Sequence, residues 1–198
     1  MYVIFEGVDT AGKSTQIELL KSNFPEIIAT KEPAGTEFGK WAREILLNGE
    51  LKSKRAETLL FLADRAEHYQ EVIKPNRASK LIISDRGFIS GIAYALANGE
   101  DFKTLVELNS YAMEGDLPDL VVLFEIDESI LRERLSKKSQ DSIEKRGIEY
   151  ILKVQDNLKK TLKRLKLNYK VVDTSKSIEQ LQKELIDILG LKEKDEIA

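Results

Sequence analysis

The sequence predicts an α/β protein in which about five parallel strands are flanked by helices on both faces. Short, continuous apolar runs recur along the chain, as expected of strands that are buried on both faces of a parallel sheet. Longer segments with a helical spacing of apolar residues separate these runs, which indicates βαβ units. A chain of 198 residues, 42% of them hydrophobic, is also long enough to bury one core without a metal or a disulfide.

Five segments are candidate strands. The first, residues 2–5, is apolar throughout and ends shortly before Gly7. Residues 78–84 and 120–126 contain similar runs, and residues 26–30 and 169–172 are shorter candidates. Since such runs alternate with helical segments, we expect the strands to lie in one parallel sheet.

Four intervening segments have the apolar period of a helix. The first begins near Lys13, and the second runs from about residue 54 to 73, with Pro75 expected beyond its end. The third covers residues 143–167, and the last ends at Gly190, a residue typical of helix C-termini. We expect one domain over residues 1–191 and a charged, solvated tail over residues 192–198.

The composition excludes several classes of protein. With no cysteine, the chain cannot form a disulfide, a thiolate zinc site or an iron–sulfur cluster. A net charge of −3 argues against a nucleic-acid partner, because such proteins usually carry a basic excess. The first residues reach Glu6 after a few apolar side chains and resemble neither a signal peptide nor a membrane anchor. We therefore expect a cytoplasmic protein with no nucleic-acid and no membrane partner.

The segment after the first candidate strand matches the phosphate-binding pattern G-x-x-x-x-G-K-[ST] and precedes a candidate helix. Successive backbone N–H groups in such a loop can hold phosphate oxygens, and the helix N-terminus adds its positive dipole end. Lys13 would bring a positive charge to the β and γ phosphates, and the Ser14 hydroxyl can bind Mg²⁺. The motif predicts that a nucleoside triphosphate binds at Gly7, Val8, Asp9, Thr10, Ala11, Gly12, Lys13, Ser14 and Thr15.

Three classes of protein use such a loop. A regulatory GTPase needs an Asn/Thr-Lys-x-Asp motif, and residues 30–33 begin like one but end in Pro33. A motor ATPase would show an Asp-Glu pair at a strand end, whereas Arg86 follows Asp85. A small-molecule kinase fits best, because Asp85 and Arg86 follow a buried strand at the sheet edge where ligands bind. There Asp85 can hold a Mg²⁺-bound water, and Arg86 can grip a phosphate.

Six segments stand out in order along the chain: residues 5–15, 32–36, 60–65, 85–94, 118–120 and 172–175. Together they resemble the motifs of thymidylate kinases over nearly the whole length of the chain. The resemblance implies the P-loop nucleoside monophosphate kinase fold. It also implies transfer of the γ-phosphate of ATP to thymidine monophosphate with Mg²⁺, usually by a homodimer.

The resemblance further implies roles for single residues. Phe61 would stack on the thymine ring, and Arg65, on the same helix face, would reach an exocyclic oxygen of the base. Arg86 and Arg43 would bind the monophosphate, and Tyr94 would crowd the C2′ position of the sugar. Asp9 would lie near the sugar 3′-hydroxyl and the metal. The implied substrate-binding residues are Asp9, Pro33, Arg43, Phe61, Arg65, Arg86, Ser90 and Tyr94, and the implied metal ligands are Ser14 and Asp85.

The resemblance implies that Asp9, Lys13 and Arg86 act in catalysis together with a cation from a lid segment at about residues 132–145. Thr10 stands where some members carry a P-loop arginine, so the lid would have to neutralise the transferring group. The candidate lid cations are Arg134, Lys137 and Lys138.

One departure from the family pattern concerns the base. Gly91 stands where members often carry a Ser, Thr or Asn that contacts the base, so the sequence leaves open how this chain reads it. Two other functions also stay open: another nucleoside monophosphate or deoxynucleoside kinase, and a regulatory nucleotide-binding protein without catalysis.

Overall fold

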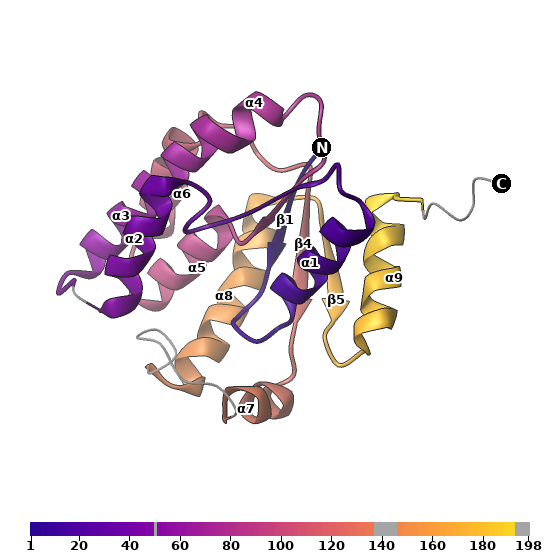
Figure 1. The fold of residues 1–198 in the computed structure, drawn as a ribbon. Helices are drawn as coiled ribbons and strands as arrows, with labels where there is room; N and C mark the ends of the chain where they lie inside the picture. The colour runs from indigo at the N-terminus through magenta and orange to yellow at the C-terminus, as the bar shows by residue number, and fades with distance from the viewer. Residues whose placement is uncertain (50, 137–145, 193–198) are drawn as a thin grey trace.

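A computed structural model describes residues 1–49, 51–136 and 146–192 (Figure 1). Within these residues, five parallel strands form one sheet in the order β2-β3-β1-β4-β5. All five candidate strands are confirmed, although β3 begins four residues later than expected because a turn follows Asn76. The strands are β1 (Tyr2–Glu6), β2 (Ile28–Lys31), β3 (Ile82–Asp85), β4 (Leu120–Glu125) and β5 (Tyr169–Asp173).

The helices follow the strands in βαβ order. The expected helix over residues 54–73 is confirmed, but Pro75 does not lie beyond the helical path, which continues to Asn76. Pro75 is tolerated because it lies in the first turn of α4, where a missing N–H breaks no helical bond. None of the described helices is long and apolar enough to cross a membrane. The helical elements are α1 (Lys13–Asn23), α2 (Glu37–Asn48), α3 (Lys54–His68), the π-helical η1 (Tyr69–Ile73), α4 (Lys74–Asn76), α5 (Phe88–Ala97), α6 (Phe102–Ala112), α7 (Glu128–Ser136), α8 (Ile148–Leu165) and α9 (Ile178–Leu189).

The third expected helix is shorter than the sequence pattern suggested. It begins at Ile148, directly after Gly147, rather than at residue 143; residues 143–145 lie outside the described part. The last helix ends at Gly190 as expected, with this glycine in the left-handed conformation.

The side chains of β1 alternate between two hydrophobic cores, one on each face of the sheet. Tyr2 and Ile4 belong to the core that includes residues of α5, α6 and α8. Val3 and Phe5 belong to the core that includes residues of α1 and α9. In Figure 1, α1 and α9 accordingly lie across the sheet from α5 and α8. Both faces are thus covered, which explains why the strands read as continuous apolar runs.

The register of β1 and β3 brings two sequence motifs together. Phe5 pairs with Asp85, and the backbone N–H of Arg86 donates to the carbonyl of Phe5 at 2.9 Å. The glycine-rich loop that leaves β1 and the Asp85–Arg86 pair that leaves β3 therefore meet at the carboxyl edge of the sheet. This is the edge at which open α/β folds bind ligands.

Candidate functional site

The loop between β1 and α1 has the backbone conformation that its glycines predict. Gly7 has a φ of 152°, and a Cβ there would lie 2.7 Å from the carbonyl oxygen of Phe124. Gly12, at the N-cap of α1, is left-handed with a φ of 92°. The loop therefore passes close to β4 and delivers the chain to the N-terminus of α1, a site suited to an anion.

Lys13 is folded back over this loop. Its Nζ donates to the carbonyls of Gly7 and Val8, both at 3.0 Å, and lies 3.9 Å from Asp85 Oδ1. The side chain is buried, and burial lowers its pKa to about 8. The ammonium group is thus held at the mouth of the loop with part of its charge compensated by Asp85.

Ser14 and Asp85 form an oxygen pair beside the loop. The Ser14 hydroxyl donates to Asp85 Oδ2 at 2.5 Å. A hydroxyl and a carboxylate are ligands that Mg²⁺ accepts, and this ion commonly completes its shell with phosphate and water. Over the residues that the structure describes, no group of three or more His, Cys, Asp or Glu could hold a metal. The chemistry of the pair fits a Mg²⁺ ion whose other ligands are phosphate and water.

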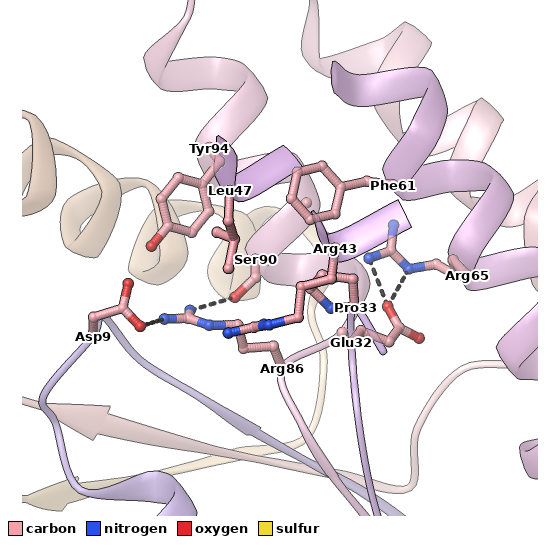
Figure 2. Close-up of a pocket in the computed structure, with 12 residues that line it drawn as sticks. Asp9, Glu32, Pro33, Arg43, Leu47, Phe61, Arg65, Arg86, Ser90 and Tyr94 are labelled. Carbon is pink, nitrogen blue, oxygen red and sulfur yellow. Dashed lines mark hydrogen bonds and ion pairs between the residues drawn. The ribbon is translucent and has the colours of Figure 1, made fainter. Parts of the chain in front are cut away.

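A pocket opens next to the loop (Figure 2). Together with the open solvent at its mouth, the pocket contains about 590 Å³ of space. Figure 2 shows the rings of Phe61 and Tyr94 on one side and the charged side chains on the other. Glu32, Leu47, Gly87 and Gly91 line this pocket. The eight residues expected to bind the substrate line it as well: Asp9, Pro33, Arg43, Phe61, Arg65, Arg86, Ser90 and Tyr94.

Arg86 links the pocket to the glycine-rich loop. Its Nη1 donates to the carbonyl of Gly7 at 2.7 Å and to Ser90 Oγ at 3.1 Å, and its Nη2 donates to Asp9 Oδ1 at 2.9 Å. The guanidinium also lies 5.7 Å from the ring centre of Tyr94. The backbone of Arg86 is left-handed, with a φ of 70°, a conformation that costs energy for a residue with a Cβ. The guanidinium is thus placed at the junction of the loop and the pocket.

Glu6 supports this junction, and the sequence analysis gave it no role. Its carboxylate accepts from the backbone N–H groups of Gly87 and Ser90, at 3.1 and 3.0 Å, and from the Ser90 hydroxyl. Gly87, the N-cap of α5, has no side chain of its own, so Glu6 caps this helix from β1. Burial raises the pKa of Glu6 to about 7. The signal in the sequence that could have identified Glu6 is its position as an acidic residue at the end of an otherwise apolar strand.

Arg65 is buried at the back of the pocket and held by two residues that the sequence analysis missed. Its Nε and Nη2 lie 2.8 and 2.7 Å from Glu32 Oε2, and its Nη1 donates to Asn109 Oδ1 at 2.6 Å. The other oxygen of Glu32 lies 2.9 Å from His68 Nδ1. Glu32 adjoins Pro33, which was assigned to the site, but nothing in the sequence connects it or Asn109 with Arg65.

Of the three candidate lid cations, the structure describes Arg134 alone. Its Nη1 donates to the carbonyl of Thr10 at 2.9 Å and its Nη2 to the carbonyl of Thr174 at 3.0 Å. Arg134 is therefore in contact with the glycine-rich loop. Lys137 and Lys138 lie outside the described residues.

Comparisons with known proteins agree with this geometry. A family model described as thymidylate kinase matches residues 5–185. A thymidylate kinase of Sulfurovum sp. is 53% identical over 190 residues, which cover 96% of this chain and 99% of that protein. One of Campylobacter curvus is 54% identical over 182 residues, covering 90% and 93%. The crystal structure of thymidylate kinase from Ehrlichia chaffeensis superposes with a TM-score of 0.76 at 26% identity, covering 96% of this chain and 98% of that one. With this fold, this pocket and these relatives, the chain belongs to the thymidylate kinase family.

Proposed function

We propose that this chain transfers the γ-phosphate of ATP to thymidine monophosphate in a Mg²⁺-dependent reaction. Membership of the family makes it a kinase that phosphorylates thymidine monophosphate to the diphosphate. This membership disfavours a regulatory nucleotide-binding protein and a kinase of another monophosphate. The observation that carries the proposal is Arg86, which lines the acceptor pocket while it is bonded to the phosphate loop.

The donor would bind at the glycine-rich loop. The backbone N–H groups of residues 7–15 would hold the triphosphate, and Lys13 would exchange its bonds to two loop carbonyls for bonds to phosphate oxygens. Mg²⁺ would be held by Ser14 Oγ and, directly or through water, by Asp85. When bound, this ion supplies charge neutralisation at the phosphate oxygens.

The acceptor would bind in the pocket beside the loop. Phe61 is half-buried and belongs to the pocket wall, which supports stacking on the thymine rather than a role in the core. Arg65 would donate to an exocyclic oxygen of the base. Arg86 and Arg43 would bind the monophosphate, and Tyr94 would exclude a 2′-hydroxyl.

The remaining residues of the pocket would position the acceptor. Pro33 and Ser90 would border it, and Asp9 would approach the sugar 3′-hydroxyl while it keeps its contact with Arg86.

The transfer step needs positioning and charge neutralisation more than covalent chemistry. An oxygen of the acceptor phosphate would attack the γ-phosphorus while the bond from that phosphorus to the β,γ-bridging oxygen breaks. Lys13 and Arg86 would offset the negative charge on either side of the transferring group. A lid cation, Arg134, Lys137 or Lys138, would offset the charge on the group itself.

We further propose the organisation of the molecule. Residues 1–191 would form one domain whose lid covers about residues 132–145, and residues 192–198 a charged tail. Large apolar side chains are exposed on α3 and on α2 and α6, which both pack against α3, and these side chains support a homodimer. We also propose a cytoplasmic enzyme without a membrane partner, and the net charge of −3 supports the absence of a nucleic-acid partner. The exposed apolar side chains on α2, α3 and α6 that support the homodimer are Trp41, Leu59, Leu108 and Tyr111.

A panel of acceptors tests the proposed reaction. ADP release from ATP would be measured with thymidine, deoxyuridine, uridine, deoxycytidine and guanosine monophosphates, with and without Mg²⁺. We expect thymidine monophosphate to give the highest kcat/KM and chelation of Mg²⁺ to abolish turnover. Equal or better use of a purine monophosphate, or full activity without a divalent cation, would contradict the proposal.

A further inference from the structure

We propose that Asn109 and Gly91 determine how this pocket reads the base, because together they fix the guanidinium of Arg65. Asn109 is a positioning residue and Gly91 supplies the space. The inference rests on the proposed function, since it places a pyrimidine between Phe61 and Arg65. It deepens that function by naming which residues make the pocket select one pyrimidine over another.

The guanidinium of Arg65 is held from two separate elements. Glu32, in the segment after β2, takes its Nε and Nη2, and Asn109, on α6, takes its Nη1. The Arg65 side chain is only 2% exposed, so water competes little with these partners. The two contacts to Glu32 orient one edge of the planar guanidinium, and the bond to Asn109 fixes Nη1 at the other edge. Loss of Asn109 therefore removes the contact that holds Nη1 in place.

Asn109 is itself oriented by its own helix. Its amide nitrogen donates to the carbonyl of Leu105 at 2.7 Å, which leaves the amide oxygen facing Arg65. Asn109 is 3% exposed and is not among the residues that line the pocket. It can therefore influence a bound base only through Arg65.

Gly91 gives the guanidinium room to reach its position. A Cβ at residue 91 would lie 2.9 Å from Arg65 Nη1 and 3.2 Å from Nη2. Contacts this short force a displacement, and Arg65 has little freedom because it is buried and bonded at both ends. At this part of the pocket wall, the arginine thus takes the space that a side chain of α5 would otherwise fill.

At this wall the pocket is lined by a hydrogen-bond donor, the guanidinium of Arg65. A guanidinium carries five N–H groups and no acceptor, and both terminal nitrogens have a second hydrogen beyond the bonds to Glu32 and Asn109. Such a wall favours a base edge with a carbonyl oxygen and disfavours one with an amino group. Thymine presents a carbonyl where cytosine presents an amino group, so a fixed Arg65 selects thymine over cytosine. A loosened Arg65 loses part of this selection.

Steady-state kinetics of Asn109→Ala and Asn109→Asp, with thymidine and deoxycytidine monophosphates, test the proposal. Asn109→Ala should raise KM for thymidine monophosphate and lower the thymidine-to-deoxycytidine ratio of kcat/KM by about tenfold or more. The reason is that the Arg65 guanidinium loses the acceptor that aligns its N–H groups with the base. KM for ATP should stay unchanged. Asn109→Asp keeps an acceptor for Arg65 but loses the amide donor to Leu105, so it should retain more of the ratio than Asn109→Ala does.

The matched control is Asn157→Ala. Asn157 is also a buried helical asparagine, and its amide donates to the carbonyl of Ala93 in α5 without touching Arg65. This variant should lose stability as Asn109→Ala does and keep the thymidine-to-deoxycytidine ratio. An equal drop of the ratio in both variants would mean that the effect is structural, and it would overturn the proposal.

Gly91→Ala provides a second test that does not depend on Asn109. It should also raise KM for thymidine monophosphate and lower the thymidine-to-deoxycytidine ratio of kcat/KM. The effect of the double variant should fall short of the product of the two single effects, because both act through one guanidinium. An unchanged ratio in Asn109→Ala or in Gly91→Ala would overturn the inference. Failure of the unaltered enzyme to use thymidine monophosphate would instead overturn the proposed function.

Discussion

Binding of ATP should weaken as the pH rises through about 8, and the reason is Lys13. Burial among loop carbonyls holds the pKa of this lysine near 8 in the ligand-free protein, well below the ordinary value of about 10.5. A triphosphate at the loop favours the charged form and should return the pKa to its ordinary range or above. Between these two values, binding must therefore be accompanied by uptake of one proton.

The size of the effect follows from the two pKa values. At pH 7 about one ligand-free molecule in ten carries neutral Lys13, and at pH 9 about ten in eleven do. The dissociation constant of ATP should then rise about tenfold from pH 7 to pH 9, which corresponds to ~1.4 kcal/mol. The same linkage applies to the stability of the ligand-free protein. Its free energy of unfolding should increase as the pH rises from about 8 to 10.5, because in this range Lys13 is protonated in the unfolded chain and largely neutral in the folded one.

Isothermal titration calorimetry in two buffers of different ionisation enthalpy measures both the affinity and the proton uptake. At pH 9 the uptake should approach one proton per ATP, and at pH 7 it should be near one tenth. Lys13→Arg serves as the control, because its side chain stays charged at both values and should show no such uptake. An affinity that is equal at pH 7 and pH 9, or an uptake that Lys13→Arg does not remove, would refute the reasoning.

Three substitution experiments test the other roles. Phe61→Ala should raise KM for thymidine monophosphate more than it lowers kcat, because the lost stack, worth ~1–3 kcal/mol of binding free energy, is made to a remote part of the substrate. A lower Tm with unchanged KM would make Phe61 a packing residue. Neutral substitution of Arg134, Lys137 or Lys138 should, in at least one case, lower kcat by about 10²–10³ and spare monophosphate affinity, and three variants with full kcat would remove the lid from catalysis. Tyr94→Ala should narrow the preference for deoxyribose over ribose more than the preference for the thymine methyl, measured as kcat/KM with uridine, deoxyuridine and thymidine monophosphates.

The strands of this fold were predictable because the sheet is covered on both faces. β1 and β4 are buried along nearly their whole length and read as uninterrupted apolar runs. Helix α6 lacked such a signal. Its fully buried positions are Leu105, Asn109 and Ala112, so a polar residue stands on the buried face at the position that holds Arg65.

The pocket was predictable to the extent that its residues lie in contiguous motifs. Phe61 and Arg65 share one helix, and Arg86, Ser90 and Tyr94 follow one strand, so family motifs identified them directly. The partners that orient these side chains come from distant parts of the chain. Glu32 and Asn109 lie 33 and 44 residues from Arg65, and local spacing carries no information on contacts of that range.

The proposed donor and acceptor sites share one charged junction, which would constrain how phosphate binds. Arg86 donates to Asp9 and to the carbonyl of Gly7, while Lys13 faces Asp85. A phosphate that binds Arg86 from the pocket competes with Asp9 Oδ1 for Nη2, and a phosphate in the loop competes with the carbonyls that now hold Lys13. Because Asp9 belongs to the loop and also lines the pocket, occupation of either site changes the charge that the other one faces. Binding of the two substrates should therefore be coupled through Asp9 and Arg86, without any need for a change of fold.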